Sequence, residues 1–438
     1  IYNPEKGGMR EVGVLDVQQI FGRAGRPQYK ENGEATIITK QPMMSRYLGM
    51  LTHQTPIESQ YIESLADNLN AEVAAGTVTS VKEAVTWLSY TYLHVRMRRN
   101  PMAYGVSYEE RSADPQLRNK RVELVQSAAR HLDDCRMLRY DARSGNLGVT
   151  DLGRVASHFY LKSETIAHFN THLKPEASMM MADVFDLVCG ASELDQVRVR
   201  DDELKELDML KKKAQVRPIR GGIENTPGKC NALLQAYVSN LFPKQFTLFS
   251  DMMYVAQNAG RIARGLFEIC LRKGWPDLAE MLLMLTKAID KQLWWEPICS
   301  PLRQFTAGGR KGGRAVGLPL ELVRKLEIAH MSLDDLCDMG PQEIGQLLRH
   351  KRIGDKVAAC VSYVPYLHLN VEVQPLTRTV LRVNIDVSAA FTWNDKAHGN
   401  SGSEPFWIWV LDSERAHIYH SEYLVMDKKT CVGTMKGT

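Results

Sequence analysis

Several signatures of enzymes are missing from this sequence. It has no G-x-x-x-x-G-K-[ST] loop, the segment that wraps the phosphates of ATP in many motor enzymes. Its eight cysteines are scattered, without a Cys-x-x-Cys pair or a Cys/His group at the spacing of metal ligands, so we expect reduced thiols and no metal site. No stretch approaches the roughly 18 apolar residues of a membrane span, so we expect no membrane partner. The first residue is Ile1 instead of methionine, and we interpret the chain as a piece of a longer protein.

The composition is that of a folded protein with several domains. A length of 438 residues predicts two to four compact units at roughly 100–200 residues per domain. Hydrophobic residues make up 44% and charged residues 24%, close to the averages of globular chains. The net charge of +4 permits a nucleic-acid partner bound through local patches but does not require one. The partner must therefore be inferred from motifs.

Periodicity predicts a multidomain, mainly α chain with a β-rich end. Residues 14–21 predict a helix and residues 35–39 a strand, and after residue 367 the apolar period changes to two. We interpret this β-rich end as an immunoglobulin-like sandwich. Such a sandwich takes roughly 100 residues, so we expect the one in this chain to be truncated. The predicted units are the end of an α/β domain over 1–45, a winged helix over 46–153, a helical bundle over 154–305, a Gly/Arg-rich linker or insertion over 306–318, a unit of short helices over 319–366 and a β-sandwich over 367–438.

The segment Gln19 to Pro27 carries the sharpest signal in the chain. Its two arginines, Arg23 and Arg26, alternate with glycines that let the backbone pass close to a ligand. A guanidinium is a rigid, permanently charged fork that suits phosphate oxygens, and a pair of them can neutralise the charge that builds on a transferring γ-phosphoryl group. A surface turn that makes salt bridges is an equal alternative for the bare motif.

The flanking residues favour the phosphate interpretation. Gln19 to Arg26 resembles motif VI, Q-x-x-G-R-x-G-R, of the Ski-like superfamily 2 helicases, in their two-cassette branch. Further blocks resemble the family in the same order: Pro56–Gln60, Leu69–Glu72, Tyr90–Leu93 with Arg96, Thr150–Arg154, Ser157–Tyr160 and Ser300–Phe305. The resemblance implies that residues 1–45 end a second RecA-like domain, that the bundle contains a ratchet helix and that residues 319–366 form a helix-hairpin-helix. The intact motif is similar to that of an ATPase-competent, N-terminal cassette.

The resemblance also implies site residues. Gln19, Gly22, Arg23 and Arg26 would contact ATP, with Arg23 and Arg26 catalytic, while ATP and Mg²⁺ would be bound mainly by residues upstream of Ile1. The turn from Asn3 to Gly13 matches a hairpin that separates strands in relatives. Alone, the chain is therefore expected not to hydrolyse ATP.

A second informative segment runs from Asp251 to Trp275 and has the pattern of a long helix. Polar residues at spacings of three and four form a stripe opposite apolar ones, and a basic stripe can follow a phosphate backbone. A solvated face is the ordinary explanation of such a stripe. The resemblance places the ratchet helix here, so Arg261 and Arg264 are the expected nucleic-acid contacts, with Gln257 and Trp275 as further candidates.

Weaker candidates lie elsewhere in the chain. Gly354 and Lys356 sit between two predicted helices, where the family has its helix-hairpin-helix and where a plain turn is equally expected. The resemblance implies that the winged helix braces the second motor domain, in preference to reading duplex grooves. Trp87, Tyr90 and Leu93 are expected in its core.

The leading hypothesis is the C-terminal part of an ATP-dependent 3′–5′ helicase cassette that translocates on a single strand and unwinds duplex DNA or RNA. The expected partners are single-stranded or partly duplex nucleic acid and protein subunits of a larger complex. The implied location is nuclear, with the cytosol as an alternative, and the implied process is DNA repair or RNA processing. A non-catalytic protein-docking platform is the alternative function. The Gly/Arg segment over 306–317 raises a third interpretation, an inactive product with an unspliced insertion.

Overall fold

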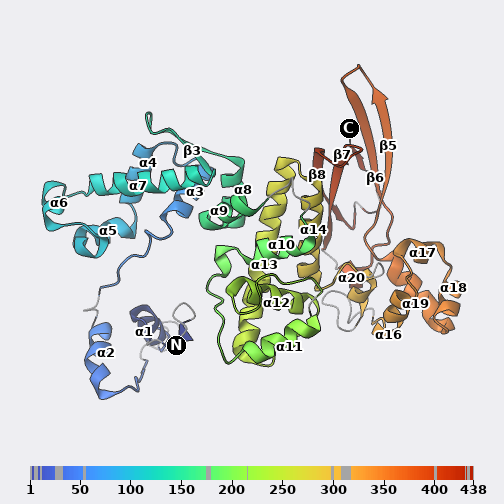
Figure 1. Cartoon of the computed structure of the whole chain (residues 1–438), viewed down its shortest axis with the longest axis horizontal. Coiled ribbons are helices and arrows are strands. Elements are labelled where there is room, and N and C mark those ends of the chain that lie inside the picture. Colours follow the sequence, from blue (N-terminus) through green and yellow to red (C-terminus); the bar gives the residue numbers. More distant parts are fainter. Residues whose placement is uncertain are drawn as a thin grey trace. The chain divides into compact units, whose positions relative to one another are not determined.

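The computed structural model describes residues 2–3, 8–9, 12–24, 33–52, 56–173, 179–214, 216–296, 300–306, 317–398, 402–429, 431 and 435–437. The chain forms two compact units. One comprises Ile1–Leu173 with Gly190–Arg200, and the other comprises Lys174–Cys189 with Asp201–Thr438. Figure 1 labels most of their helices and the longer strands.

The first unit begins with a short hairpin and two helices. Strand β1 (Tyr2–Asn3) pairs antiparallel with β2 (Gly8–Met9). The predicted helix is confirmed as α1 (Val14–Phe21), which packs against α2 (Met44–Leu51) after the 3-10 turn η1 (Gln41–Met43). The predicted strand over 35–39 is wrong, since these residues have no regular structure. A strand needs a partner to satisfy its backbone groups, and none of the described residues pairs with this segment.

The winged helix follows, and its helices and wing agree with the sequence pattern. Ser80 begins one helix by accepting a hydrogen bond from the amide of Glu83, and Ser107 and Glu110 form a capping box at another. The antiparallel wing pairs Leu138 with Val149. The elements are α3 (Leu65–Ala75), α4 (Val81–Ser89), α5 (Tyr92–Arg99), η2 (Pro101–Tyr104), α6 (Tyr108–Ala113), α7 (Arg118–Asp134), β3 (Leu138–Tyr140) and β4 (Leu147–Val149).

Of the three residues expected in the core of this domain, only Leu93 is fully buried. Trp87 is half-buried, with its ring centroid 6.2 Å from that of Tyr61. Tyr90 is 85% exposed, so its placement in the core was wrong. It follows the last residue of α4, where the chain turns and the side chain meets solvent.

Two further helices complete this unit beyond the predicted boundary at 153. They are α8 (Asp151–Phe159) and α9 (Ser163–His172), and the short turn η3 (Ser192–Leu194) also belongs here. The amide of Asn70 donates to the carbonyl of Gly153 over 2.9 Å. A Cβ atom on Gly153 would lie 2.2 Å from the carbonyl oxygen of Met137, so only glycine allows α8 to approach the wing this closely.

A helical bundle opens the second unit. Its elements are α10 (Met181–Cys189), α11 (Leu204–Ala214), α12 (Thr226–Val238), α13 (Phe246–Lys273) and α14 (Pro276–Lys291). Helix α12 is central, because every residue from Gly228 to Val238 is buried. The buried ammonium of Lys229 is paired with the carboxylates of Glu203 and Asp251, as a charge in such surroundings requires.

A compact group of short helices comes next. It contains η4 (Ser300–Phe305), α16 (Leu320–Ile328), α17 (Leu333–Asp338), α18 (Pro341–Leu347) and α19 (Lys351–Ser362). Their core includes Leu302, Phe305, Val323, Ile344 and Val357. Thr306 and Leu318 form an isolated bridge, and the predicted Gly/Arg linker between them lies outside the described residues, apart from its ends.

The β-rich end forms small antiparallel sheets. One sheet has the strand order β5-β6-β9, and the other pairs β7 with β8. The elements are β5 (Leu367–Pro375), β6 (Leu381–Ala389), the short helix α20 (Asp395–His398), β7 (Ser403–Leu411), β8 (Ile418–Asp427) and β9 (Met435–Gly437). Strand β7 rests on the bundle, since Trp407 meets Phe267 of α13 edge-on at 5.0 Å. An immunoglobulin-like topology stays a prediction.

Two further sequence predictions concern the cysteines and membrane-spanning helices. The cysteines among them are free thiols, and burial raises the pKa of Cys270 to about 12. Within the described ranges, no helix combines the length and the apolar character that crossing a membrane requires.

Candidate nucleic-acid interface

Helix α13 has the two faces that the sequence pattern predicts. Ile262, Leu266 and Ile269 are buried against the bundle. On the other side Gln257 and Arg264 are exposed and Arg261 is half-buried. The helix begins earlier than expected, at Phe246, and ends before Trp275. Three of the predicted nucleic-acid contacts therefore lie together on one face of one rigid element.

The two arginines of this face are held by neighbouring polar groups. Arg264 Nε donates to the carbonyl of Gly260 over 3.2 Å, and its Nη1 lies 3.7 Å from a carboxylate oxygen of Asp290 on α14. Arg261 Nη2 donates to the side chain of Asn258 over 2.9 Å. The side chain of Arg264 is still 50% exposed, so a phosphate can reach it. The face therefore presents two guanidinium groups held by neighbouring polar groups, and that of Arg264 stays half-exposed beside its carboxylate partner.

Trp275 lies apart from this face. It follows Gly274, which ends α13 in the left-handed conformation, and it is the residue directly before α14. The ammonium group of Lys273 lies over its indole ring, 4.7 Å from the centroid. This cation–π contact covers one face of the half-buried ring, which makes Trp275 a poorer stacking surface than the sequence suggested.

The motif VI residues lie at the C-terminal end of α1. Gln19, Gly22 and Arg23 are all exposed there, and the amide of Gly22 bonds to the carbonyl of Gln18 over 2.9 Å to close the helix. Arg26 lies outside the described residues. The side-chain amide of Gln19 and the guanidinium of Arg23 are groups that can bind phosphate oxygens. The remaining groups that ATP and Mg²⁺ require were expected upstream, and the described residues contain no group of three or more His, Cys, Asp or Glu able to hold a metal ion.

The expected hairpin position of Gly354 and Lys356 was wrong. Both lie inside α19, and the turn between α18 and α19 is at 348–350. A Cβ atom on Gly354 would lie 1.9 Å from the carbonyl oxygen of Pro341, so this glycine allows the two helices to cross closely. Lys356 Nζ donates to the carbonyl of Gly317 over 2.8 Å. The helix crossing and this hydrogen bond give both residues a structural role. Their contact with nucleic acid stays a prediction.

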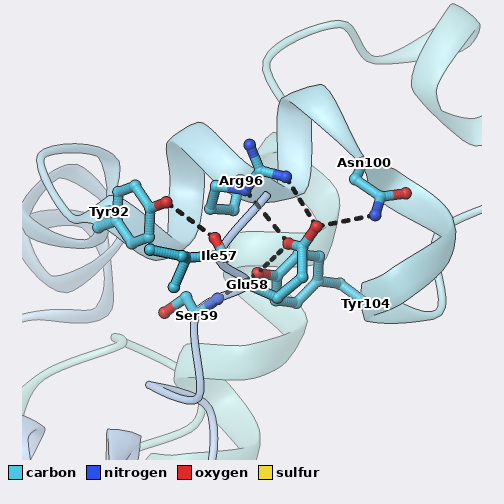
Figure 2. Close-up of polar contacts among 7 residues, drawn as sticks. All are labelled: Ile57, Glu58, Ser59, Tyr92, Arg96, Asn100 and Tyr104. Atoms are coloured by element: carbon cyan, nitrogen blue, oxygen red, sulfur yellow. Dashed lines mark hydrogen bonds and ion pairs between the residues drawn. The ribbon is translucent and has the colours of Figure 1, made fainter. Parts of the chain in front are cut away.

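A polar cluster around Glu58 was missed by the sequence reasoning (Figure 2). Arg96 binds the Glu58 carboxylate through Nε at 3.2 Å and Nη2 at 2.7 Å. Asn100 Nδ2 and the Tyr104 hydroxyl each donate to it over 2.8 Å. Hydrogen bonds from Arg96 and Asn100 outweigh the effect of burial and lower the pKa of Glu58 from 4.5 to about 2.

The cluster fixes the segment that enters the winged helix. The Tyr92 hydroxyl donates to the carbonyl of Ile57 and the amide of Ser59 donates to the Tyr104 hydroxyl, so the backbone is held on both sides of Glu58 (Figure 2). Glu58 and Arg96 both occur in the blocks that resemble helicases. Their separation along the chain hid the contact, and no local pattern reveals it.

Comparison with known protein families identifies two regions of the chain. Residues 149–436 match the family described as the Sec63 Brl domain. Residues 58–134 match a family described as a winged helix-turn-helix domain. The second match covers the helices that precede the wing, and it confirms the winged helix predicted from the sequence.

Individual relatives match along nearly the whole chain. The activating signal cointegrator 1 complex subunit 3 of Gallus gallus is 49% identical over 433 residues, which is 99% of this chain and 19% of that protein. The DExH-box ATP-dependent RNA helicase DExH14 of Arabidopsis thaliana is 44% identical over the same shares. The U5 small nuclear ribonucleoprotein 200 kDa helicase of Homo sapiens is 42% identical over 429 residues, which is 98% of this chain and 19% of that protein. The chain thus spans about a fifth of these relatives, and the predicted resemblance to the two-cassette helicases is confirmed.

Proposed function

The chain belongs to the Sec63 Brl-domain family, and from this premise we propose that it is the C-terminal part of one cassette of an ATP-dependent 3′–5′ nucleic-acid helicase. In this proposal the bundle holds the translocated single strand. The observation that carries it is the face of α13 on which Gln257, Arg261 and Arg264 lie together above a buried apolar side. Two relatives named as helicases, each more than 40% identical, support the same class of activity.

In the proposed mechanism, residues near the N-terminus act on ATP and residues of the bundle hold the single strand. Arg23 and Arg26 approach the γ-phosphate from the second motor domain, where their charge stabilises the transferring phosphoryl group. ATP and Mg²⁺ would be held mainly by residues upstream of Ile1, and ATP would supply the free energy that closes the motor. On closure, Arg261 and Arg264 hold the phosphates of the single strand, and the hairpin of β1 and β2 separates the duplex.

The winged helix has a bracing role in this proposal. Its entry segment is fixed by the Glu58 cluster, so movement of the motor domain is passed to a stiff element instead of being absorbed by a loose linker. A relative named as a complex subunit supports further protein subunits as partners. A relative named as a small nuclear ribonucleoprotein helicase supports a nuclear location. We propose both for this protein.

The test is the salt dependence of binding to a fluorescent single-stranded oligonucleotide. Binding to phosphates releases counterions, so the logarithm of affinity should fall steadily between about 50 and 200 mM salt. The double variant Arg261→Ala with Arg264→Ala should weaken binding and make the slope shallower by about 0.7 for each lost phosphate contact. Fluorescence anisotropy of the 438-residue chain measures both quantities.

A matched control removes two exposed arginines from another surface. Arg98 and Arg99 lie on α5 of the winged helix, and their replacement by alanine makes the same change of net charge. This control should keep the wild-type slope. Equal effects of the two double variants, or a wild-type chain that binds proteins only and without salt dependence, would refute the proposal and favour the docking platform.

A further inference from the structure

Three phenylalanines are exposed where α13 begins. Phe246, the first residue of the helix, is 82% exposed, Phe242 is 48% exposed and Phe249 is 38% exposed. The ring centroids of Phe242 and Phe249 lie 6.1 Å apart. A single exposed apolar residue is ordinary, but a group of large rings on one spot marks a binding surface.

This aromatic group continues the polar face of α13. Phe246, Met253, Gln257 and Arg264 are separated by seven, four and seven residues, which keeps them on one side of a helix. With a rise of 1.5 Å per residue, Phe246 lies about 16 Å along the axis from Gln257. Anything long and flexible that runs along the arginines toward the helix N-terminus therefore reaches the rings.

The loop that carries Phe242 is held in place. The carboxylate of Glu206 accepts hydrogen bonds from the amides of Lys244 and Gln245, and the side chain of Asn240 donates to the carbonyl of Gln292 over 2.9 Å. Glu206 is thus engaged by the backbone, while the side chain of Lys244 is exposed between Phe242 and Phe246. The rings are presented on a fixed support beside a cation, so little entropy is lost when a ligand binds.

We propose that Phe242, Phe246 and Phe249 form a stacking platform for the unpaired bases of the single strand whose phosphates lie on Arg261 and Arg264. The inference rests on the proposed function and extends its site to a second kind of contact. Continuity with the arginine face favours nucleic acid over a protein partner, because a strand has both the charge that the arginines require and flat bases for the rings. Stacking of this kind tolerates any base.

The test compares variants that separate ring shape from apolar area. Phe246→Leu with Phe249→Leu keeps an apolar surface but removes the flat rings, whereas Phe246→Tyr with Phe249→Tyr keeps the rings. The leucine variant should weaken binding of a single-stranded oligonucleotide by about 10-fold or more for each ring removed, and the tyrosine variant should bind like the wild type. 2-Aminopurine is placed at successive positions along the oligonucleotide. In the leucine variant, and not in the tyrosine variant, its stacking-dependent quenching should be lost at a single position.

The salt slope distinguishes this inference from the function on which it rests. The leucine variant changes no charge, so its slope should equal that of the wild type, in contrast to Arg261→Ala with Arg264→Ala. If the arginine variant weakens binding and the leucine variant does not, the platform is refuted and the helicase proposal stands. If the wild type itself does not bind, both are refuted. Phe246, Phe249 and Arg264 are exposed and Arg261 is half-buried. Unchanged thermal unfolding by circular dichroism confirms that each variant is folded.

Discussion

Glu58 carries a charge that the surrounding residues are arranged to keep. It accepts four hydrogen bonds from Arg96, Asn100 and Tyr104, and about a third of its side chain is exposed. The folded-state pKa of about 2 lies below the ordinary 4.5, so the unfolded chain binds the proton more tightly than the folded chain does. The cluster therefore stabilises the fold fully above pH 4.5, and this contribution is lost as the pH falls toward 2.

Glu58→Gln tests this contribution with little change of shape. The variant should lower the free energy of unfolding by about 1–3 kcal/mol at neutral pH, because Arg96 is left nearly buried without its carboxylate. The difference from the wild type should shrink as the pH approaches 2. Urea unfolding across this pH range measures it, and hydrogen exchange of residues 56–60 reports it locally.

The exposed carboxylate of Glu109, on α6 of the same unit, provides the control. Glu109→Gln removes the same charge without removing a partner of Arg96, so its effect should stay within about 0.5 kcal/mol. If both variants unfold at the same urea concentration at neutral pH, the cluster has no stabilising role.

Two pairs of helices in the second unit show how a glycine sets the distance between elements. Gly354 of α19 faces the backbone of α18, where a Cβ atom would lie 1.9 Å from the Pro341 carbonyl oxygen and 2.9 Å from the Gly345 nitrogen. Gly260 of α13 faces α14, but the nearest atom to its Cβ position is a methyl group of Ile289 at 3.5 Å. The first crossing requires glycine, and the second has room for alanine.

Alanine at each position should therefore act in opposite directions. Gly354→Ala should destabilise the protein by about 1–3 kcal/mol, because backbone has to move away from backbone. Gly260→Ala should be neutral or stabilise by about 0.5–1 kcal/mol, since alanine favours a helix interior over glycine. Thermal unfolding followed by circular dichroism compares the two. A loss of stability for Gly260→Ala as large as that for Gly354→Ala would contradict the role assigned to the close crossing.

For the whole molecule, the proposed activity depends on residues that this chain does not contain. It spans about a fifth of the relatives. Gln19 and Arg23 are exposed at the end of α1, but the sequence has no phosphate-binding loop. ATP turnover should consequently require the longer protein. The 438-residue chain by itself should show none.

In the longer protein, Arg23→Ala or Arg26→Ala should lower the rate of ATP hydrolysis by about 10³-fold, as expected when an arginine that stabilises a transferring phosphoryl group is removed. Binding of single strands should change little, because the arginines of α13 remain. Arg143→Ala, in the exposed turn of the wing, is the control and should hydrolyse ATP like the wild type. If the Arg23 variant hydrolyses ATP at the wild-type rate, Arg23 does not take part in hydrolysis.

Much of the architecture follows from local patterns. The helix at 14–21, the buried side of α13 and the change to period two after 367 were all readable, because neighbouring residues decide which side of an element is apolar. The predicted strand at 35–39 failed for the opposite reason. Whether such a segment becomes a strand depends on a partner elsewhere, and the local pattern does not contain that information.

The candidate site divides in the same way. Helical spacing alone placed Gln257, Arg261 and Arg264 on one face of α13, and motif VI alone drew attention to Gln19 and Arg23. Tertiary structure decided the partners of Glu58, which lie 38 to 46 residues away along the chain. It also decided that Phe242, Phe246 and Phe249 are exposed. It also moved Gly354 from a turn into a helix crossing. The sequence by itself determined what repeats along one element, whereas burial and pairing between distant residues emerged only when the elements packed against one another.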